Sequence, residues 1–401
     1  MLIYVFAEHY PTPYKPQFDS EFAYFLRQGH QLNIFAGGKY LSTVHPRVKE
    51  YQLDQISKTI PTTLKTIPRH AFKILSNTIH SPIISASRFR QIWEGRKGIK
   101  ARLVSALRAL TLPHRAPDVC YIHNLATADF VDFLKTIYPG CPLYMYFHGG
   151  EVGGVRRIAR DAELFSLMDA IFTNTEFSKT QAIKRGASPE KTFVIPVGFD
   201  LPDYPKTENK QYRPDGVLRT VSIGRVSEEK GLIYAVDAVG EAKARGDIEL
   251  LYTIVGSGVQ EKYLKDYVRS KGLESQITFA GERDKDGVVN VLVNSDVLLI
   301  PSIVTETWAE TQGAVIQEAM FTGTLVVSTR TGGIPESCAP VLKRFSVDPE
   351  NATQIYEAAK MICALSEDQM AEIGEEARRF AIERYDIEKT GGEILRYMCL
   401  R

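Results

Sequence analysis

Short apolar runs alternate with helix-length amphipathic segments along the whole chain, and this alternation limits the fold more than any other feature. Runs of continuous Val, Ile, Leu and Tyr character separated by helices are typical of parallel sheets buried on both faces. We predict strands at residues 2–7, 32–36, 119–123, 143–147, 170–173, 192–195, 220–223, 250–255, 277–279, 297–301 and 325–328.

Many of these runs end in small or polar residues, such as His148-Gly149 in the first half and Gly224 in the second. In open α/β sheets, ligands bind at the carboxyl ends of the strands. Residues 200–216 interrupt the alternation with prolines and charges, which is typical of an interdomain linker. We therefore predict an α/β protein with two doubly wound domains that face each other across a cleft.

The composition agrees with a globular chain of more than one domain. The 401 residues are 44% hydrophobic and 24% charged, which argues against a disordered or fibrous protein. No apolar run approaches the roughly 18–20 residues of a membrane helix. The start, residues 1–7, lacks a basic segment and is expected to be a strand rather than a signal peptide. The five cysteines are scattered, with no Cys-x-x-Cys pair, so we expect a reducing, cytoplasmic location without a disulfide framework or zinc site.

The net charge of +1 hides an uneven distribution. Residues 1–200 carry 25 basic and 16 acidic side chains, and residues 201–401 carry 24 and 32. Residues 55–115 carry twelve basic side chains and one acidic one, with apolar residues such as Phe89 and Ile99 among them. This segment suits an anionic membrane surface or a phosphate-bearing substrate; the alternative is a basic helical face that is merely solvated. No groove-reading motif accompanies the charge, so nucleic acid is not an expected partner.

The loop after residues 220–223 carries two cations at a strand end. Gly224 allows the chain to turn, and Arg225 and Lys230 then project from one loop. Two such cations can neutralise a diphosphate, and arginine can bind it in a bidentate manner. An ordinary charged surface loop is the alternative interpretation.

A helix is predicted over residues 313–322, closed by Gly323. Its N-terminus offers unpaired backbone amides at Thr311, Gln312 and Gly313. Helix N-termini bind anions, so this position suits a phosphate or a cluster of sugar hydroxyls.

Two glutamates flank the start of this helix. Glu310 precedes it, and Glu318 lies within it among apolar residues. A carboxylate in such surroundings needs hydrogen-bond donors, which a ribose diol supplies. Alternatively, Glu310 only favours the helix dipole and Glu318 is a salt-bridged surface residue. The Gly332-Gly333 turn that follows a later strand is, by itself, an ordinary strand–helix loop.

Taken together and in this order, these segments resemble the nucleotide-binding domain of retaining GT-B-fold glycosyltransferases of family 4, the bacterial polysaccharide-type group 1 enzymes. The matching motifs are Gly224-Arg225…Lys230-Gly231, Val255-Gly-Ser-Gly258, Phe279-Ala-Gly281, Pro301-Ser302, Glu310-(seven residues)-Glu318, Gly332-Gly-Ile-Pro-Glu336 and, more faintly, His148-Gly149 and Asn174-Thr-Glu-Phe-Ser178. The resemblance implies a GT-B fold of two Rossmann-like domains. The implied parts are an acceptor-side domain (1–199), a linker (200–216), a nucleotide-sugar donor domain (217–380) and a C-terminal helix (381–401) that packs back on the first domain.

The resemblance also implies roles for individual residues. Arg225 and Lys230 bind the donor diphosphate and stabilise charge on the leaving nucleotide. Glu310 binds hydroxyls of the transferred sugar, Glu318 holds the ribose, and His148 lies under the sugar near its anomeric carbon. The other implied donor-binding residues are Gly224, Gly256, Gly281, Glu282, Arg283, Thr311, Gln312, Gly313 and Ala314.

The expected function is transfer of a hexose, with UDP-glucose the first candidate donor, to a lipid-linked saccharide in polysaccharide biosynthesis. The resemblance implies retention of configuration and no metal or other cofactor. Residues 55–115 are expected to contact the inner face of the plasma membrane. The alternatives are a GT-B-fold nucleotide-sugar epimerase, which needs no acceptor, and a two-lobed binding protein without turnover. The first loop lacks the Gly-Gly pair of many family members, with Lys15 as a candidate substitute, and Trp308 is a candidate for shaping the sugar pocket.

Overall fold

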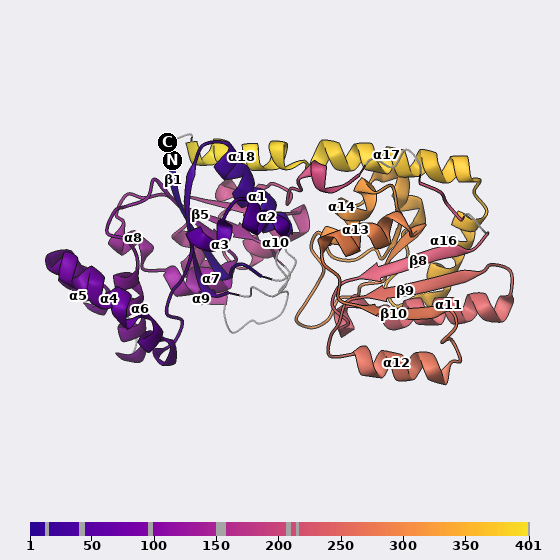
Figure 1. Ribbon diagram of the computed structural model, residues 1–401, viewed down its shortest axis with the longest axis horizontal. Coiled ribbons are helices and arrows are strands. Elements are labelled where there is room, and N and C mark those ends of the chain that lie inside the picture. The colour runs from indigo at the N-terminus through magenta and orange to yellow at the C-terminus, as the bar shows by residue number, and fades with distance from the viewer. Residues whose placement is uncertain are drawn as a thin grey trace.

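Two α/β domains lie side by side in the computed structural model (Figure 1). It describes residues 1–12, 16–39, 45–94, 99–149, 158–205, 210–213 and 216–399. Lys15 lies outside these ranges, so its expected role is not addressed by the structure.

The sheet of the N-terminal domain is entirely parallel, in the order β3-β2-β1-β4-β5-β6-β7. Its strands are β1 (Leu2–His9), β2 (Gln31–Gly38), β3 (Ser57–Thr59), β4 (Val119–His123), β5 (Leu143–Phe147), β6 (Ala170–Thr173) and β7 (Thr192–Val194). The α-helices of this half are α1 (Pro16–Arg27), α2 (Pro46–Glu50), α3 (Leu53–Ile56), α4 (Ala71–His80), α5 (Pro82–Glu94), α6 (Ile99–Thr111), α7 (Leu125–Val131), α8 (Leu134–Ile137), α9 (Ile158–Ser166) and α10 (Glu176–Lys184). Shorter 3₁₀ turns are η1 (Leu64–His70) and η3 (Pro189–Lys191).

The C-terminal domain has a parallel sheet in the order β10-β9-β8-β11-β12. Its strands are β8 (Leu218–Ile223), β9 (Leu250–Val255), β10 (Ile277–Gly281), β11 (Val297–Ile300) and β12 (Leu325–Ser328). The helices and turns of this half are η5 (Glu228–Lys230), α11 (Leu232–Arg245), α12 (Glu261–Ser270), α13 (Lys285–Val293), α14 (Ala314–Phe321), α15 (Ile334–Ser337), η6 (Pro340–Phe345), α16 (Ala352–Cys363), α17 (Glu367–Tyr385) and α18 (Ile387–Cys399).

The predicted fold class is confirmed. Each of the eleven apolar runs is a strand, and helices separate them. In both sheets, the strand order reverses beside the first strand, between β1 and β4 and between β8 and β11. Such a switch point leaves a crevice at the carboxyl ends of the strands, where open α/β sheets bind ligands. Because Gly224 follows β8 and Pro301 follows β11, the loops singled out from the sequence lie at this crevice.

The chain crosses between the domains twice, and the two crossings are hydrogen-bonded to each other. The first passes through Phe199 and the 3₁₀ turn η4 (Leu201–Asp203), and the second passes through Asp386 between α17 and α18. The Phe199 amide donates to the Tyr385 carbonyl (2.8 Å), and the Ile387 amide donates to the Phe199 carbonyl (2.9 Å). A hinge made of two paired segments defines one axis for any relative motion of the domains.

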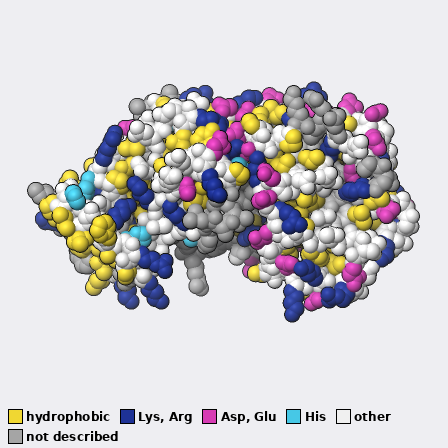
Figure 2. Space-filling view, viewed as in Figure 1, with side chains coloured by type: hydrophobic (Ala, Val, Ile, Leu, Met, Phe, Trp, Pro, Cys, Tyr) yellow, Lys and Arg dark blue, Asp and Glu magenta, His cyan; other side chains and the backbone are white. Residues whose placement is uncertain are grey.

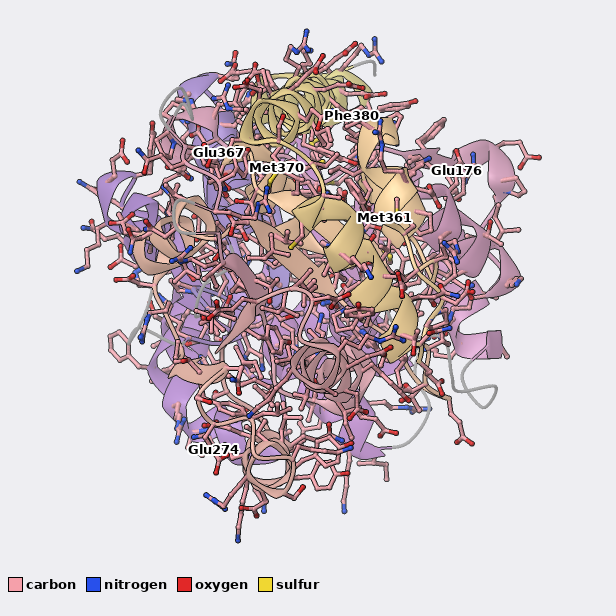
Figure 3. All side chains as sticks on the ribbon, turned by 90° about the vertical axis from the view of Figure 1, so that its right-hand side faces the viewer. Glu176, Glu274, Met361, Glu367, Met370 and Phe380 are labelled. Atoms are coloured by element: carbon pink, nitrogen blue, oxygen red, sulfur yellow. The ribbon has the colours of Figure 1, made fainter. Side chains whose placement is uncertain are left out.

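The last two helices run along one edge of the molecule and join the domains (Figure 1). Helix α17 packs on α14, and its Met370 is buried. Figure 3 shows α17 and α16 from the end of the C-terminal domain, with Met370 on the former and the half-exposed Met361 on the latter. Helix α18 packs on α1, where Arg27 pairs with Glu388 at 3.0 Å. The segment 381–401 therefore begins inside α17, and only α18 lies on the N-terminal domain.

Helices α4, α5 and α6 form a projection at the end of the N-terminal domain far from α12 (Figure 1). Part of its positive charge is structural. The Arg88 guanidinium is buried and donates to the carbonyls of Leu112 (3.2 Å) and Pro113 (3.0 Å), near the C-terminal end of α6. Arg108 is also buried and donates to the Pro61 carbonyl at 2.6 Å. These two arginines are therefore not part of a basic surface that faces solvent or a membrane.

Candidate active site

Two adjoining cavities occupy the crevice at the carboxyl ends of β8 and β11. The first, the His45 cavity, has a volume of about 330 Å³, and the second, the Glu318 cavity, has about 350 Å³. Gly224 and Arg225 belong to the walls of both. The N-terminal domain contributes His45 to the first and Gln17 of α1 to the second. An elongated ligand can therefore extend from one cavity into the other while it touches both domains.

The close packing of the loops around these cavities depends on two glycines. Gly231 has φ 60°, and a Cβ atom there would lie 2.0 Å from the Pro301 carbonyl oxygen. Gly256 has φ 128°, and a Cβ atom there would lie 1.9 Å from the Gly224 carbonyl oxygen. Glycine is the residue that tolerates both the backbone conformation and the approach. These positions therefore hold the loops after β8, β9 and β11 in contact.

Lys230 and Glu310 face each other in the wall of the Glu318 cavity. The lysine ends η5, the glutamate lies in the loop before α14, and their side chains form an ion pair. The family resemblance implies a separate ligand group for each residue, a phosphate for Lys230 and a sugar for Glu310. In the ligand-free protein each is the partner of the other, so an anion in the cavity competes with Glu310 for the ammonium group of Lys230.

Arg225 is held between two side chains of its own domain. Its guanidinium lies 3.0 Å from Glu229 and 5.5 Å from the centre of the Trp308 ring. The arginine side chain is 65% exposed, and it borders both cavities. A cation stacked on an aromatic face is oriented as well as stabilised. Trp308 is absent from the described walls of both cavities, so its contact with the site runs through Arg225.

Glu318 is buried, with 2% of its surface exposed. The Tyr204 hydroxyl, from the first interdomain crossing, donates to its Oε1 at 3.1 Å. The alternative that Glu318 is a salt-bridged surface residue is therefore wrong. A buried carboxylate in a cavity wall is suited to accept hydrogen bonds from a ligand that enters.

The residues at the N-terminus of α14 contact both the Glu318 cavity and the N-terminal domain. Gly313 and Ala314 line the Glu318 cavity, but the side chains of the two preceding residues contact the N-terminal domain. Thr311 Oγ1 accepts from Asn174 Nδ2 at 3.0 Å, and Gln312 exchanges hydrogen bonds with the Val197 backbone at 3.0 and 3.3 Å. These two side chains thus join the domains beside the cavity.

His148 directly follows β5 and is half-buried. Its ring packs against Tyr146, with centroids 4.8 Å apart, and against Phe18 at 5.5 Å. Ser178 Oγ lies 3.4 Å from the His148 carbonyl and 2.6 Å from Oδ1 of Asn174, the residue that contacts Thr311. His148 lies outside the described walls of both cavities, so its placement under a donor sugar stays a prediction.

The far wall of the His45 cavity contains Gly256, Glu282 and Arg283. Ser257 donates a hydrogen bond to Glu282 across the ends of β9 and β10. Gly281, the last residue of β10, precedes this wall and is not in its described lining.

Sequence reasoning missed an ion cluster behind this cavity. Asp203, in the first crossing, lies 2.7 Å from Lys285 of α13, 2.7 Å from Arg47 and 3.4 Å from His45. Burial alone would raise the pKa of Asp203, but the adjacent His45 ring and the charges of Arg47 and Lys285 hold the pKa well below its usual range. The cluster ties the C-terminal wall of the cavity to the N-terminal domain.

A second missed contact involves Glu336. Its carboxylate accepts hydrogen bonds from the amides of Glu176 (2.7 Å) and Phe177 (2.9 Å) at the start of α10; Figure 3 labels Glu176 there. A carboxylate is stabilised at a helix N-terminus by the unpaired amides and the helix dipole. The Gly332–Glu336 motif is thus an interdomain contact rather than only a turn.

Comparisons with known proteins agree with this fold. Residues 203–380 match the model of the family Glycosyl transferases group 1. A candidate colanic acid biosynthesis glycosyltransferase, WcaL of Salmonella typhimurium, is 32% identical over 218 residues, which are 53% of this chain and 52% of WcaL. The amylovoran biosynthesis glycosyltransferase AmsK of Erwinia amylovora is 28% identical over 198 residues, 47% of each chain. The alignments span about half the length of these relatives.

The whole chain resembles solved structures of low sequence identity. HepE of Anabaena, in a complex with UDP and glucose, superposes with a TM-score of 0.72 at 17% identity, covering 99% of each chain. This likeness defines a GT-B architecture, in which two Rossmann-like domains enclose the ligand cleft. Residues 203–380 thus resemble the group 1 family of glycosyltransferases, and the chain as a whole shares the GT-B fold.

Proposed function

We propose that this chain transfers a hexose from a nucleoside diphosphate sugar to a saccharide acceptor in polysaccharide biosynthesis, with UDP-glucose as the first candidate donor. The observation that carries the proposal is the pair of adjoining cavities that meet at Gly224 and Arg225. The Glu318 cavity has Lys230 and a buried carboxylate in its wall. The His45 cavity is bounded by residues at strand ends and by charged residues such as Arg283 and Lys285. The polysaccharide-related names of WcaL and AmsK support the acceptor class.

In this proposal, each part of the donor occupies a defined position along the two cavities. The base enters the His45 cavity beside Glu282 and Arg283, and the ribose hydroxyls donate to Glu318. The diphosphate then lies between Arg225 and Lys230, and the sugar hydroxyls contact Glu310 and the amides at the start of α14. Support for this order comes from Arg225, which borders both cavities, and from Lys230, Glu310 and Glu318, which line the second.

The proposed reaction proceeds with retention by attack on the face from which the nucleotide leaves. The bond between the anomeric carbon and the β-phosphate oxygen breaks, with its electron pair going to the phosphate. The acceptor hydroxyl forms the new bond to the same carbon and gives its proton to the departing phosphate oxygen. Arg225 and Lys230 stabilise the negative charge that develops, which is the role that preorganised cations play in such steps.

We expect transfer to continue in excess EDTA. The proposed partners of the diphosphate are side-chain cations and helix amides, which provide the charge compensation that a divalent ion supplies in other enzymes. The measurement is the rate of sugar release from the donor and of product formation, with and without the chelator. A rate that falls to background and returns with Mg²⁺ or Mn²⁺ contradicts a metal-independent reaction.

A donor screen by thermal unfolding tests the proposed substrate class. A ligand at 100 times its dissociation constant stabilises the folded protein by about 2.7 kcal/mol. UDP-, GDP- and ADP-sugars are compared, and one of them is expected to raise the unfolding temperature, with UDP-glucose first. If none of them stabilises the protein, the donor assignment fails.

The same donor separates the alternative functions. Incubation without any acceptor releases an epimerised sugar nucleotide if the protein is an epimerase. A two-lobed binding protein is stabilised by the donor but turns over nothing when acceptors are added. A glycosyltransferase consumes donor in proportion to the acceptor supplied.

A lipid-linked acceptor at the inner, cytoplasmic face of the plasma membrane completes the proposal. The support is the basic segment 55–115, which belongs to the N-terminal domain. Its surface-exposed cations are available to lipid or diphosphate groups, whereas Arg88 and Arg108 are not. Among the residues that the structure describes, no helix combines the length and apolar character needed to cross a bilayer.

A further inference from the structure

Helix α4 presents an apolar face that the rest of the protein does not cover. None of the residues of α4 is buried. Phe72, Leu75 and Ile79 are 85%, 58% and 66% exposed. Their spacing of three and four residues places them on one side of the helix. An amphipathic helix of a globular domain usually turns such a face to the core, so the exposed face of α4 needs another explanation.

The exposed apolar side chains gather on one projection of the molecule. Half of the ten large apolar side chains that are exposed among the described residues lie on α4–α6. They are Phe72, Leu75, Ile79, Ile84 and Ile99, which we call the tip patch. Figure 2 shows hydrophobic side chains concentrated at this end, with Lys and Arg side chains beside them. Apolar residues that gather in this way on a surface mark a contact site.

The charges around the tip patch are predominantly positive. Exposed cations flank it at Lys65, Arg69, Arg90 and Lys100, and residues 55–115 contain a single acidic residue. A partner for this surface must therefore be apolar in its interior and anionic at its edge. Contact between two copies of the tip would bring like charges together, which is unfavourable. An anionic lipid bilayer meets both requirements.

We infer that the tip patch inserts into the interfacial region of an anionic bilayer while the surrounding lysines and arginines contact lipid phosphates. This deepens, and rests on, the membrane contact in the proposed function. The sequence already placed apolar residues among the basic ones of this segment, and the structure shows Phe72, Leu75 and Ile79 exposed on α4. The structure adds an apolar anchor, so that the attachment has one component that salt screens and one that it does not.

The first test is sedimentation of the full chain with vesicles of phosphatidylglycerol and phosphatidylcholine. We expect the wild type to bind at low salt and to keep a measurable part of its binding as ionic strength rises. The Phe72→Ser/Leu75→Ser variant should lower the partition coefficient by about ten-fold or more, because two large apolar side chains no longer leave water. The Val259→Ser/Met361→Ser variant is the matched control, since both residues are exposed on the C-terminal domain. It should bind as the wild type does.

The second test locates the side chain in the membrane. In a Phe72→Trp variant, the introduced indole should be quenched by lipids brominated on their acyl chains, beyond any quenching of the wild type. A Lys65→Glu/Arg69→Glu variant should lose the salt-sensitive part of the binding. Unchanged binding of the Phe72→Ser/Leu75→Ser variant, or an unquenched indole, overturns insertion. Failure of the wild type to bind vesicles overturns the membrane contact itself.

Two further measurements distinguish membrane insertion from the proposed donor site and from dimerisation. Nucleotide affinity without vesicles should be the same in the tip variants and the wild type, because the tip is remote from both cavities. If the wild type does not bind the nucleotide at all, the proposed donor site is contradicted. The vesicle measurements then still test membrane insertion independently. A lipid-free dimer that the Phe72→Ser change dissociates would show that the patch joins two copies, and would overturn the bilayer as its partner.

Discussion

Replacement of Lys230 by alanine is expected to lower the rate of sugar transfer by at least about 100-fold, the scale of losing a preorganised charge partner in a transition state. The lysine lines the Glu318 cavity and is paired with Glu310. In the ligand-free protein, the ion pair keeps the ammonium group in the cavity wall. In the proposed transition state, the same group meets the charge that develops on the leaving nucleotide. The loss should therefore fall mainly on kcat.

Two comparison variants make the result specific. Lys265→Ala removes an exposed lysine of α12 that pairs with Glu261 at 2.6 Å and lies over the Phe279 ring at 5.3 Å. Because Lys265 is outside the described walls of both cavities, the activity of this variant should match the wild type. Lys230→Ala/Glu310→Gln removes both charges, so it should not recover the rate if the ammonium group acts on the nucleotide. Recovery in the double variant would mean that the unpaired Glu310 carboxylate had caused the defect. A Lys230→Ala rate within a few-fold of wild type contradicts the diphosphate assignment.

The fold could be predicted because it depends on local patterns. A parallel strand buried on both faces must be apolar throughout, so β4 and β5 stand out in the sequence as continuous apolar runs. The strand that was missed, β3, has the sequence Ser-Lys-Thr and lies at the edge of its sheet. An edge strand of three residues is held by backbone hydrogen bonds on one side, and its side chains carry little apolar signal.

The candidate site could be predicted only in part. The loops at Gly224 and Glu310 were found because strand-end glycines and paired charges are visible in sequence. The contact of Tyr204 with Glu318 spans 114 residues, and no local pattern marks it. The same holds for the Asp203 cluster, which joins residues of both domains. For Arg88 the sequence indicated too much, because it was counted with the basic residues that could contact a membrane. The sequence does not distinguish a solvated arginine from one that donates to carbonyl groups near a helix end, as Arg88 does.

The second large effect is expected at Glu318. Glu318→Gln should weaken nucleoside diphosphate binding by about ten- to hundred-fold, because hydrogen bonds to a charged group contribute about 1.5–3 kcal/mol and each 1.4 kcal/mol is ten-fold in affinity. Glutamine keeps the shape and still accepts a hydrogen bond from the Tyr204 hydroxyl, so the fold should tolerate the change. Titration calorimetry with UDP, or with the nucleotide that the donor screen selects, measures the loss.

Deoxyribose analogues determine whether this loss concerns the ribose. If Glu318 accepts from the ribose hydroxyls, the wild type should bind the ribonucleotide more tightly than its 2′-deoxy or 3′-deoxy form, and Glu318→Gln should lose most of that preference. Tyr204→Phe removes the hydroxyl that donates to this carboxylate, and Tyr204 is outside the described walls of both cavities. It should therefore weaken binding less and keep the preference. A coupling measured in this way reports the contact itself rather than general damage to the cavity. Equal preference for ribose in the wild type and in Glu318→Gln would show that Glu318 shapes the cavity without holding the sugar.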